Sequence, residues 1–142
     1  MRVLLDTNIL LDVLLNRPAL VDDSEAVILR CEKLDAEMLV AWHGLATAYY
    51  LLKRGRTEAE ALAEVDKILA WASIADASDK AARRARGLGF SDFEDALQAA
   101  AAEASHADCI VTRNTADYVR ASVPAFLPQD FLKQFPEDSP AK

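Results

Sequence analysis

Short apolar segments alternate along this chain with longer segments whose apolar residues recur at helical spacing. The short segments predict buried strands, and the longer ones predict amphipathic helices. Proline and glycine mark where helices stop, as at Pro18 and Gly55. The predicted elements, in order, are strand 2–5, helix 8–15, a helix capped by Asp23 or Ser24, strand 38–42, helix 43–54, helix 57–71, strand 73–77, a helix from 78 or 79 to 87, helix 92–105, strand 109–112 and strand 126–127.

Two helix starts carry the pattern of a capping box, in which Ser or Thr is followed three residues later by Glu. Thr57 with Glu60 is the first, and Ser91 with Glu94 is the second. In the helix that follows Thr57, several apolar residues share one face and are expected to point inward. They are Leu62, Val65, Ile68 and Leu69.

Strands that alternate with helices form parallel sheets covered by helices on both faces, so we predict an α/β fold. The length of 142 residues suits one domain, with a frayed tail at 136–142. In such sheets ligands bind at the carboxyl ends of the strands. Residues that directly follow the strands are therefore the first candidates for a functional site.

A carboxylate follows directly after the first predicted strand. Asp6 comes after three apolar residues, and a second acidic cluster, Asp92, Glu94 and Asp95, opens the helix that leads into strand 109–112. If these two strands are parallel neighbours, both sets of carboxylates converge at one edge of the sheet. Convergent carboxylates raise one another's pKa unless a cation neutralises them. Hard oxygen ligands of this kind favour Mg²⁺ or Mn²⁺.

The net charge of −7 argues against a protein that grips nucleic acid over its whole surface, because phosphate binding depends on clustered Lys and Arg. Positive charge is nonetheless grouped at 53–56 and at 83–86. Each group suits either the C-terminus of a helix or a local contact with phosphate, and the sequence leaves both interpretations open.

The apolar segments are too short to span a bilayer, and Asp6 interrupts the first of them. We therefore expect a cytoplasmic protein with no membrane partner. Cys31 lies in a predicted helix and Cys109 in a predicted strand, and neither belongs to a CxxC or Cys/His pattern. Two reduced thiols in the core are expected.

Three motifs in order resemble those of PIN-domain proteins. They are Asp6-Thr7-Asn8 after the first strand, the acidic helix start at 91–97, and Thr112-Arg113-Asn114 followed by Asp117-Tyr118. The resemblance is strongest to the VapC-like branch, the toxins of bacterial toxin–antitoxin pairs, and it covers residues 2–132.

This resemblance implies a three-layer α/β/α sandwich with a mainly parallel sheet, forming a single PIN-like domain over residues 1–135. It also implies an Mg²⁺- or Mn²⁺-dependent endoribonuclease that hydrolyses RNA, forms a homodimer and is inhibited by a cognate antitoxin protein. Asp6 and Asp95 match two of the family's acids. Thr47 and Asn114 stand where the family carries a Glu and an Asp. Each replacement removes a negative charge from the site, so metal affinity should be lower.

The candidate site contains residues of three predicted roles. The catalytic residues are Asp6, Asp92, Asp95 and Asn114. The metal ligands are Asp6, Asp95 and Asp92. The substrate-binding or positioning residues are Thr7, Asn8, Thr112 and Asp117.

Several acidic and polar residues also have a purely structural interpretation. Asp92 and Glu94 suit the start of a helix, where negative charge is favoured. His43 is more often structural than a ligand in such a position. Asp12 and Asp117 are expected at the surface, although Asp117 lies where it could replace a missing acid.

Three alternative functions can be compared with the same residues, which support the first and argue against the other two. The replacements at Thr47 and Asn114 suit a catalytically weakened domain that binds protein or RNA. A phosphohydrolase of the haloacid dehalogenase kind needs a second Asp two residues after the first, where this chain has Asn8. A dinucleotide-binding enzyme needs GxGxxG after a strand, whereas the Gly-Leu-Gly at 87–89 follows a helix.

Overall fold

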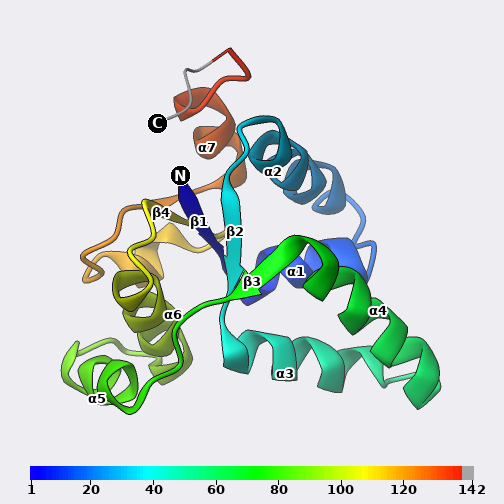
Figure 1. Ribbon diagram of the computed structural model, residues 1–142, viewed down its shortest axis with the longest axis horizontal. Helices are drawn as coiled ribbons and strands as arrows, with labels where there is room; N and C mark the ends of the chain where they lie inside the picture. Colours follow the sequence, from blue (N-terminus) through cyan, green and yellow to red (C-terminus); the bar gives the residue numbers. More distant parts are fainter. Residues whose placement is uncertain (139–142) are drawn as a thin grey trace.

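A five-stranded, all-parallel sheet forms the centre of the protein in a computed structural model that describes residues 1–138 (Figure 1). The strand order is β3-β2-β1-β4-β5. The strands are β1 (Arg2–Leu5), β2 (Glu37–Val40), β3 (Ala72–Ile74), β4 (Cys109–Val111) and β5 (Ala125–Phe126). Residues 139–142 of the predicted tail lie outside the described residues.

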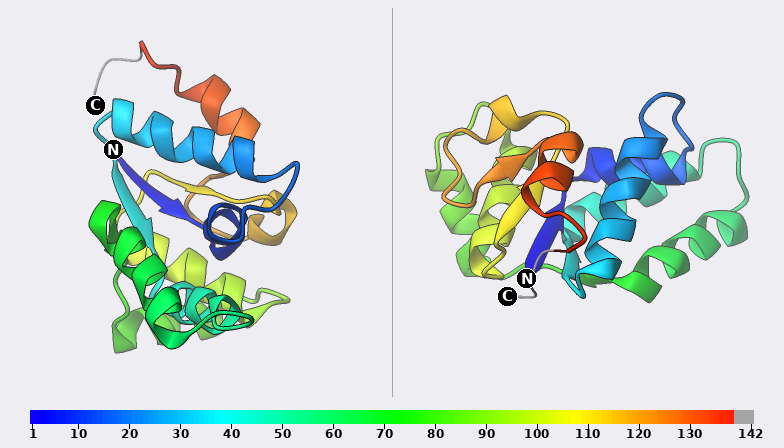
Figure 2. Two further views of the ribbon diagram at one scale, coloured as in Figure 1. Left: turned by 90° about the vertical axis from the view of Figure 1, so that its right-hand side faces the viewer. Right: turned by 90° about the horizontal axis from the view of Figure 1, so that it is seen from above.

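Helices cover both faces of the sheet, which confirms the predicted α/β/α sandwich. The helices are α1 (Thr7–Leu14), α2 (Val21–Lys33), α3 (Trp42–Leu52), α4 (Glu58–Trp71), α5 (Asp79–Gly87), α6 (Phe93–Ala104), α7 (Pro128–Gln134) and the 3₁₀ helix η1 (Thr115–Tyr118). Figure 2 shows α2 and α7 on one face and α5 and α6 on the other, with α3 and α4 forming an extended pair. No helix within residues 1–138 is long and apolar enough to cross a membrane.

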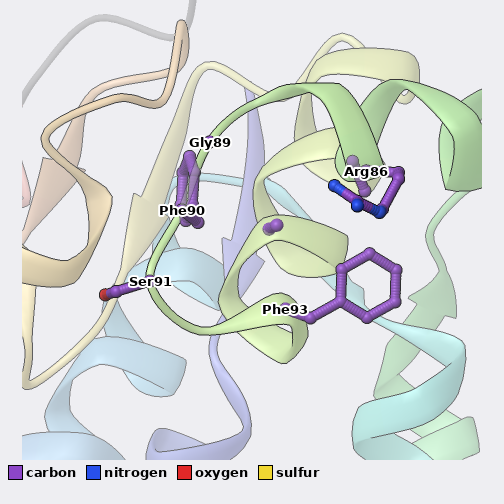
Figure 3. Close-up of a pocket in the computed structure, with 7 residues that line it drawn as sticks. Arg86, Gly89, Phe90, Ser91 and Phe93 are labelled. Atoms are coloured by element: carbon purple, nitrogen blue, oxygen red, sulfur yellow. The ribbon is translucent and has the colours of Figure 1, made fainter.

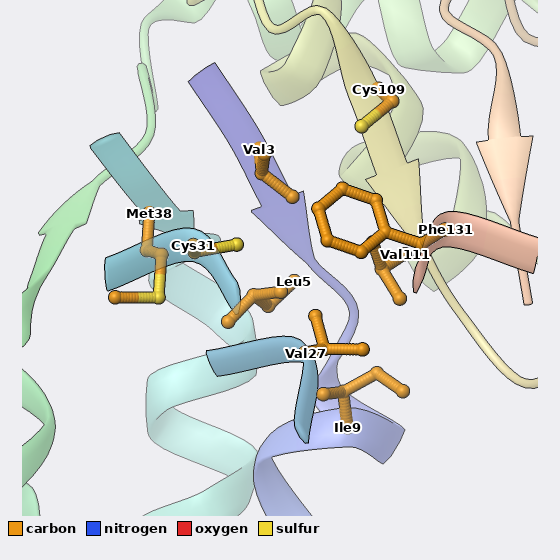
Figure 4. Close-up of a cluster of buried hydrophobic side chains, with 9 residues drawn as sticks. All are labelled: Val3, Leu5, Ile9, Val27, Cys31, Met38, Cys109, Val111 and Phe131. Carbon is orange, nitrogen blue, oxygen red and sulfur yellow. The ribbon is translucent and has the colours of Figure 1, made fainter. Parts of the chain in front are cut away.

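Alternate residues of β1 point to opposite faces of the sheet and enter different clusters of the core. Val3 and Leu5 pack with α2 and α7, where Phe131 is fully buried (Figure 4). Leu4 packs on the other face against the alanines of α6. These small side chains let the helix approach the sheet closely, and burial of both faces explains why the strands are apolar throughout.

The register of the sheet brings the ends of its central strands level. Leu5 of β1 pairs with Val40 of β2 on one side and with Val111 of β4 on the other. The residues that follow these strands, Asp6 and Thr112 among them, therefore meet at one edge.

Some predicted boundaries were wrong. α2 begins at Val21, before the predicted caps, and β2 ends at Val40, so that Trp42 begins α3. Strand β5 ends at Phe126, and the helix α7 that follows was not predicted; it begins at Pro128, which suits the first turn of a helix.

The predicted inward face of α4 was also partly wrong. Leu62 and Leu69 are 46% and 48% exposed, whereas Ala61 and Ile68 are buried. Ile68 is buried as predicted, whereas Ala61 takes the inward place expected of Leu62, where α4 packs on α3 and on the edge strand β3.

Both cysteines lie in the core as free thiols, as predicted. Burial raises the pKa of Cys31 and of Cys109 to about 12, so the reactive thiolate is scarce at neutral pH.

We expect neither thiol to react with a disulfide reagent such as DTNB at pH 8 in the folded protein, and both to react in denaturant. Rapid reaction of either thiol without denaturant would contradict this packing.

Candidate functional site

The side chain of Asp6 lies at the carboxyl end of β1 and is only 6% exposed. Its backbone N–H donates to the carbonyl oxygen of Val111 at 3.0 Å, which holds it beside the end of β4. Its Oδ2 accepts hydrogen bonds from Thr112 Oγ1 at 2.7 Å, from Tyr118 Oη at 3.0 Å and from Asn8 Nδ2 at 3.4 Å. These donors compensate the cost of burying a negative charge.

Asn8 and Thr112 join the start of α1 to the end of β4. Asn8 Nδ2 donates to Thr112 Oγ1 at 3.3 Å, and Asn8 Oδ1 accepts from the backbone N–H of Arg113 at 3.4 Å. Thr112 Oγ1 also accepts from the backbone N–H of Asn114 at 3.1 Å. The first and third sequence motifs therefore form one connected network around the Asp6 carboxylate.

Asp92 is the N-cap of α6. Its Oδ1 accepts from the backbone N–H groups of Glu94 at 2.8 Å and Asp95 at 3.2 Å. The predicted capping box at Ser91 was therefore wrong by one residue, because the Asp side chain satisfies these N–H groups instead. The cap fixes the first turn of α6, which carries the half-buried Asp95.

Asp95 is the acid whose titration is most perturbed. Burial, followed by the nearby charges of Asp92, Asp6 and Asp117, raises its pKa from 3.8 to about 6. Its only hydrogen bond from a side chain in the described part of the chain comes from Tyr118 Oη at 3.5 Å, which is long. The site thus concentrates negative charge that its own donors do not fully offset.

Tyr118 is the site residue that the sequence did not identify. It ends η1, is 3% exposed and packs edge-on against Phe90 with ring centroids 6.2 Å apart. Burial, and then the charges of Asp6 and Asp95, raises its pKa above the ordinary value, so the phenol stays protonated and can donate. The Asp117-Tyr118 pair was visible in the sequence, but nothing there shows that the hydroxyl reaches back to β1.

Two further residues from the predicted set, like Asp92, lie at the surface of the site. Asn114 and Asp117 are both exposed, and the N–H of Asp117 donates to the carbonyl oxygen of Asn114 at 3.0 Å within η1. Asp117 is near enough to contribute to the raised pKa of Asp95.

Thr7 faces the helices rather than the carboxylates. Its Oγ1 accepts from Gln98 Nε2 of α6 at 2.8 Å. A Cβ added to Gly44 of α3 would lie 2.5 Å from the same oxygen, so glycine is what allows α3 to pack this closely. Thr7 therefore binds α1 to α6 through Gln98 and lies close to α3 at Gly44.

The position predicted to replace the family's second acid also makes a structural contact. Thr47 Oγ1 donates to the carbonyl oxygen of His43 in its own helix at 3.0 Å. His43 Nε2 lies 3.2 Å from the carbonyl oxygen of Glu94, which ties the start of α3 to the start of α6.

The prediction that Asp12 is a surface acid was wrong. Asp12 is fully buried, and its Oδ2 accepts from Ser24 Oγ at 2.8 Å and from Arg113 Nε at 2.9 Å. Arg17 lies 3.6 Å from its Oδ1. Asp12 is three residues after the buried Ile9 on the same helical face, a spacing that could have revealed its burial.

The acids of the site form a pair rather than a larger cluster. Within residues 1–138, no three His, Cys, Asp or Glu side chains are grouped closely enough to hold a metal ion by themselves. Asp6 and Asp95 nevertheless suit a hard cation, because Mg²⁺ is commonly held by one or two carboxylates, with water and substrate oxygens as the other ligands. All the donors to Asp6 converge on Oδ2; Oδ1 accepts no hydrogen bond from a described residue and is not sealed from solvent.

A pocket of about 390 Å³ lies beside the start of α6 (Figure 3). The half-exposed ring of Phe93 and the side chain of Arg86 lie next to each other at one side of it, and Phe90 lies at the other. Through the contact of Phe90 with Tyr118, this pocket adjoins the packing that supports the acidic pair.

The acidic pair lies at the carboxyl edge of the parallel sheet, where α/β proteins commonly bind ligands. Residues 2–116 match the PIN domain family. The chain therefore belongs to the PIN domain family, as its three motifs predicted. No match was found among curated proteins.

Two solved structures have similar folds. A chain in the structure of VapBC2 from Rickettsia felis, bound to a DNA fragment from the promoter, superposes with a TM-score of 0.67 at 19% identity, over 89% of this chain and 98% of that one. A chain of VapBC-1 from nontypeable Haemophilus influenzae gives a TM-score of 0.69 at 14% identity, over 91% and 99%. At these identities the likeness concerns the fold.

Removing the Asp12 carboxylate should destabilise the protein strongly. In Asp12→Ala, Arg113 and Ser24 lose their buried partner, and we expect a loss of about 3 kcal/mol of unfolding free energy, measured by urea denaturation. The matched control is Asp66→Ala, which removes an exposed acid of α4 and should change stability by less than about 0.5 kcal/mol. Equal effects of the two substitutions would contradict the structural role of Asp12.

The raised pKa of Asp95 predicts a pH-dependent difference in stability. Since its folded pKa lies above the unfolded one, ionisation costs stability; the cost is absent below about pH 4, grows as pH rises to about 6 and is complete above it. In EDTA, Asp95→Asn should therefore gain stability over wild type across this interval, reaching about 1 kcal/mol because partial solvation weakens the effect. Chemical denaturation at pH 4, 5, 6 and 7 measures it, and a difference that does not vary with pH would contradict the prediction.

Proposed function

We propose that the protein is an Mg²⁺- or Mn²⁺-dependent endoribonuclease that hydrolyses phosphodiester bonds of RNA, and that it is the toxin of a toxin–antitoxin pair. The observation that carries this proposal is the meeting of Asp6 and Asp95 at one hydroxyl, on the carboxyl edge of the sheet of a PIN domain.

In this proposal Asp6 and Asp95 hold the cation, and Asp92, one turn earlier on α6, adds negative charge beside them. Thr112 and Asn8 keep the Asp6 carboxylate in place through its Oδ2. Asn114 and Asp117 are exposed at the mouth of the site, where they can contact the substrate or its water. A bound Mg²⁺ or Mn²⁺ would supply a water of lowered pKa and neutralise charge on the phosphate.

The pocket beside α6 supports a single-stranded RNA substrate. Unpaired bases stack on aromatic rings and on Arg guanidinium groups, and Phe93 and Arg86 present one of each. Since the whole chain has a net charge of −7, binding of nucleic acid must depend on local positive groups of this kind.

A cognate antitoxin and a second copy of the chain are the proposed protein partners, in the cytoplasm. The α3–α4 pair exposes large apolar side chains that suit a protein interface. They are Trp42, Tyr50, Leu62 and Leu69. The likeness of fold to chains of two VapBC structures is consistent with a toxin of this class.

A catalytically weakened binding module is the second candidate. Thr47 and Asn114 supply no third carboxylate. The observation that favours this candidate is that no group of three His, Cys, Asp or Glu side chains that could hold a metal exists in the part of the chain that the structure describes. This candidate predicts a folded protein that binds partners but not divalent cations.

The deciding experiment is calorimetric titration with Mn²⁺ followed by an RNA cleavage assay. The wild-type protein should bind Mn²⁺ and cleave single-stranded RNA only when the cation is present. An Asp6→Asn, Asp95→Asn double variant should lose the binding and lower the cleavage rate by about 100-fold or more.

Glu94→Gln is the matched control, because it removes one negative charge from the same turn of α6 at an exposed position. It should keep both Mn²⁺ binding and cleavage. Wild-type protein that is folded but binds no Mn²⁺ would contradict the nuclease and support the binding module.

A further inference from the structure

The Tyr118 hydroxyl lies between the two carboxylates of the proposed cation site and contacts one oxygen of each. It is 3.0 Å from Asp6 Oδ2 and 3.5 Å from Asp95 Oδ1. A phenol has a single proton to donate, and the shorter distance shows that Asp6 is its principal acceptor. Tyr118 thereby connects an acid at the end of β1 with an acid on α6, two segments that are far apart in the sequence.

The position of this hydroxyl is set by the core and not by the acids alone. The Tyr118 ring is buried in the cluster that contains Leu4, Ile110 and the alanines of α6, and it packs edge-on against Phe90. A ring held in this way has little freedom to move, so its hydroxyl keeps a fixed position between the two carboxylates.

The contacts of Tyr118 also decide which oxygens stay available. Asp6 Oδ2 and Asp95 Oδ1 are the atoms that accept its hydrogen bonds. The other oxygen of each group, Asp6 Oδ1 and Asp95 Oδ2, accepts no hydrogen bond from the residues that the structure describes, and neither is sealed from solvent. A cation can therefore bind the free oxygens without displacing the hydroxyl.

We propose that Tyr118 is a positioning residue, which donates its hydrogen bond to the inner oxygen of Asp6, contacts the inner oxygen of Asp95, and so aims their outer oxygens at a shared divalent cation. This inference rests on the proposed metal-dependent function. It gives the site a neutral support beside its two carboxylates, because hydrogen bonds to the ligating carboxylates strengthen metal binding.

The test is Tyr118→Phe, which removes the hydroxyl and keeps the ring against Phe90. Calorimetric titration with Mn²⁺ should show affinity about tenfold weaker than wild type, the lower end of the usual cost of losing such a support. The unfolding temperature in EDTA should stay within a few degrees of the wild-type value, since Thr112 and Asn8 still donate to Asp6. Unchanged affinity would overturn the inference, and tighter binding would show that the hydroxyl competes with the cation.

Two further variants separate positioning from packing. Tyr49→Phe removes a tyrosine hydroxyl whose contact is with Glu58, outside the acidic site, and should leave Mn²⁺ affinity unchanged. Tyr118→Leu removes both ring and hydroxyl. If only the leucine variant loses affinity, ring packing is the cause and the inference fails.

The same experiment distinguishes this inference from the proposed function. Absence of Mn²⁺ binding by the wild-type protein contradicts both. Binding by the wild type that Tyr118→Phe does not weaken contradicts the role of Tyr118 alone.

Discussion

The burial of the Asp6 carboxylate is the constraint on which the rest of the site depends. A negative charge at 6% exposure is tolerated only where hydrogen-bond donors surround it, and here they come from α1, from the end of β4 and from η1. The parallel pairing of β1 with β4 brings the first two together. Packing of the Tyr118 ring against Phe90 supplies the third. The interactions that hold the fold together therefore also assemble the site.

Much of the fold could be predicted because it depends on local signals. Apolar runs marked the strands, and Thr57 and Ser78 marked helix starts that the structure confirms. The layers and the parallel sheet followed from the order of these elements. The helix α7 was missed although Pro128 suits the first turn of a helix. The face of α4 was misplaced because an exposed leucine and a buried one cannot be told apart by residue type.

The site could be predicted less completely than the fold. Asp6, Asn8 and Thr112 were found because they belong to motifs at the ends of strands that lie side by side. The burial of Asp12 and the reach of Tyr118 depend instead on contacts with partners distant in the sequence, Arg113 in one case and Asp6 in the other. A pattern of residue types and spacings describes each residue's neighbours along the chain, whereas the roles of Asp12 and Tyr118 are set by their neighbours in space.

The separation in sequence between Asp6 and Tyr118 has a consequence for when the site can form during synthesis. Asp6 is synthesised more than 100 residues before its donors at 112 and 118. Until then β1, the central strand, lacks its neighbour β4, since contacts of such separation form only after the intervening chain exists. A nascent chain, or one truncated before Tyr118, therefore carries an unassembled site.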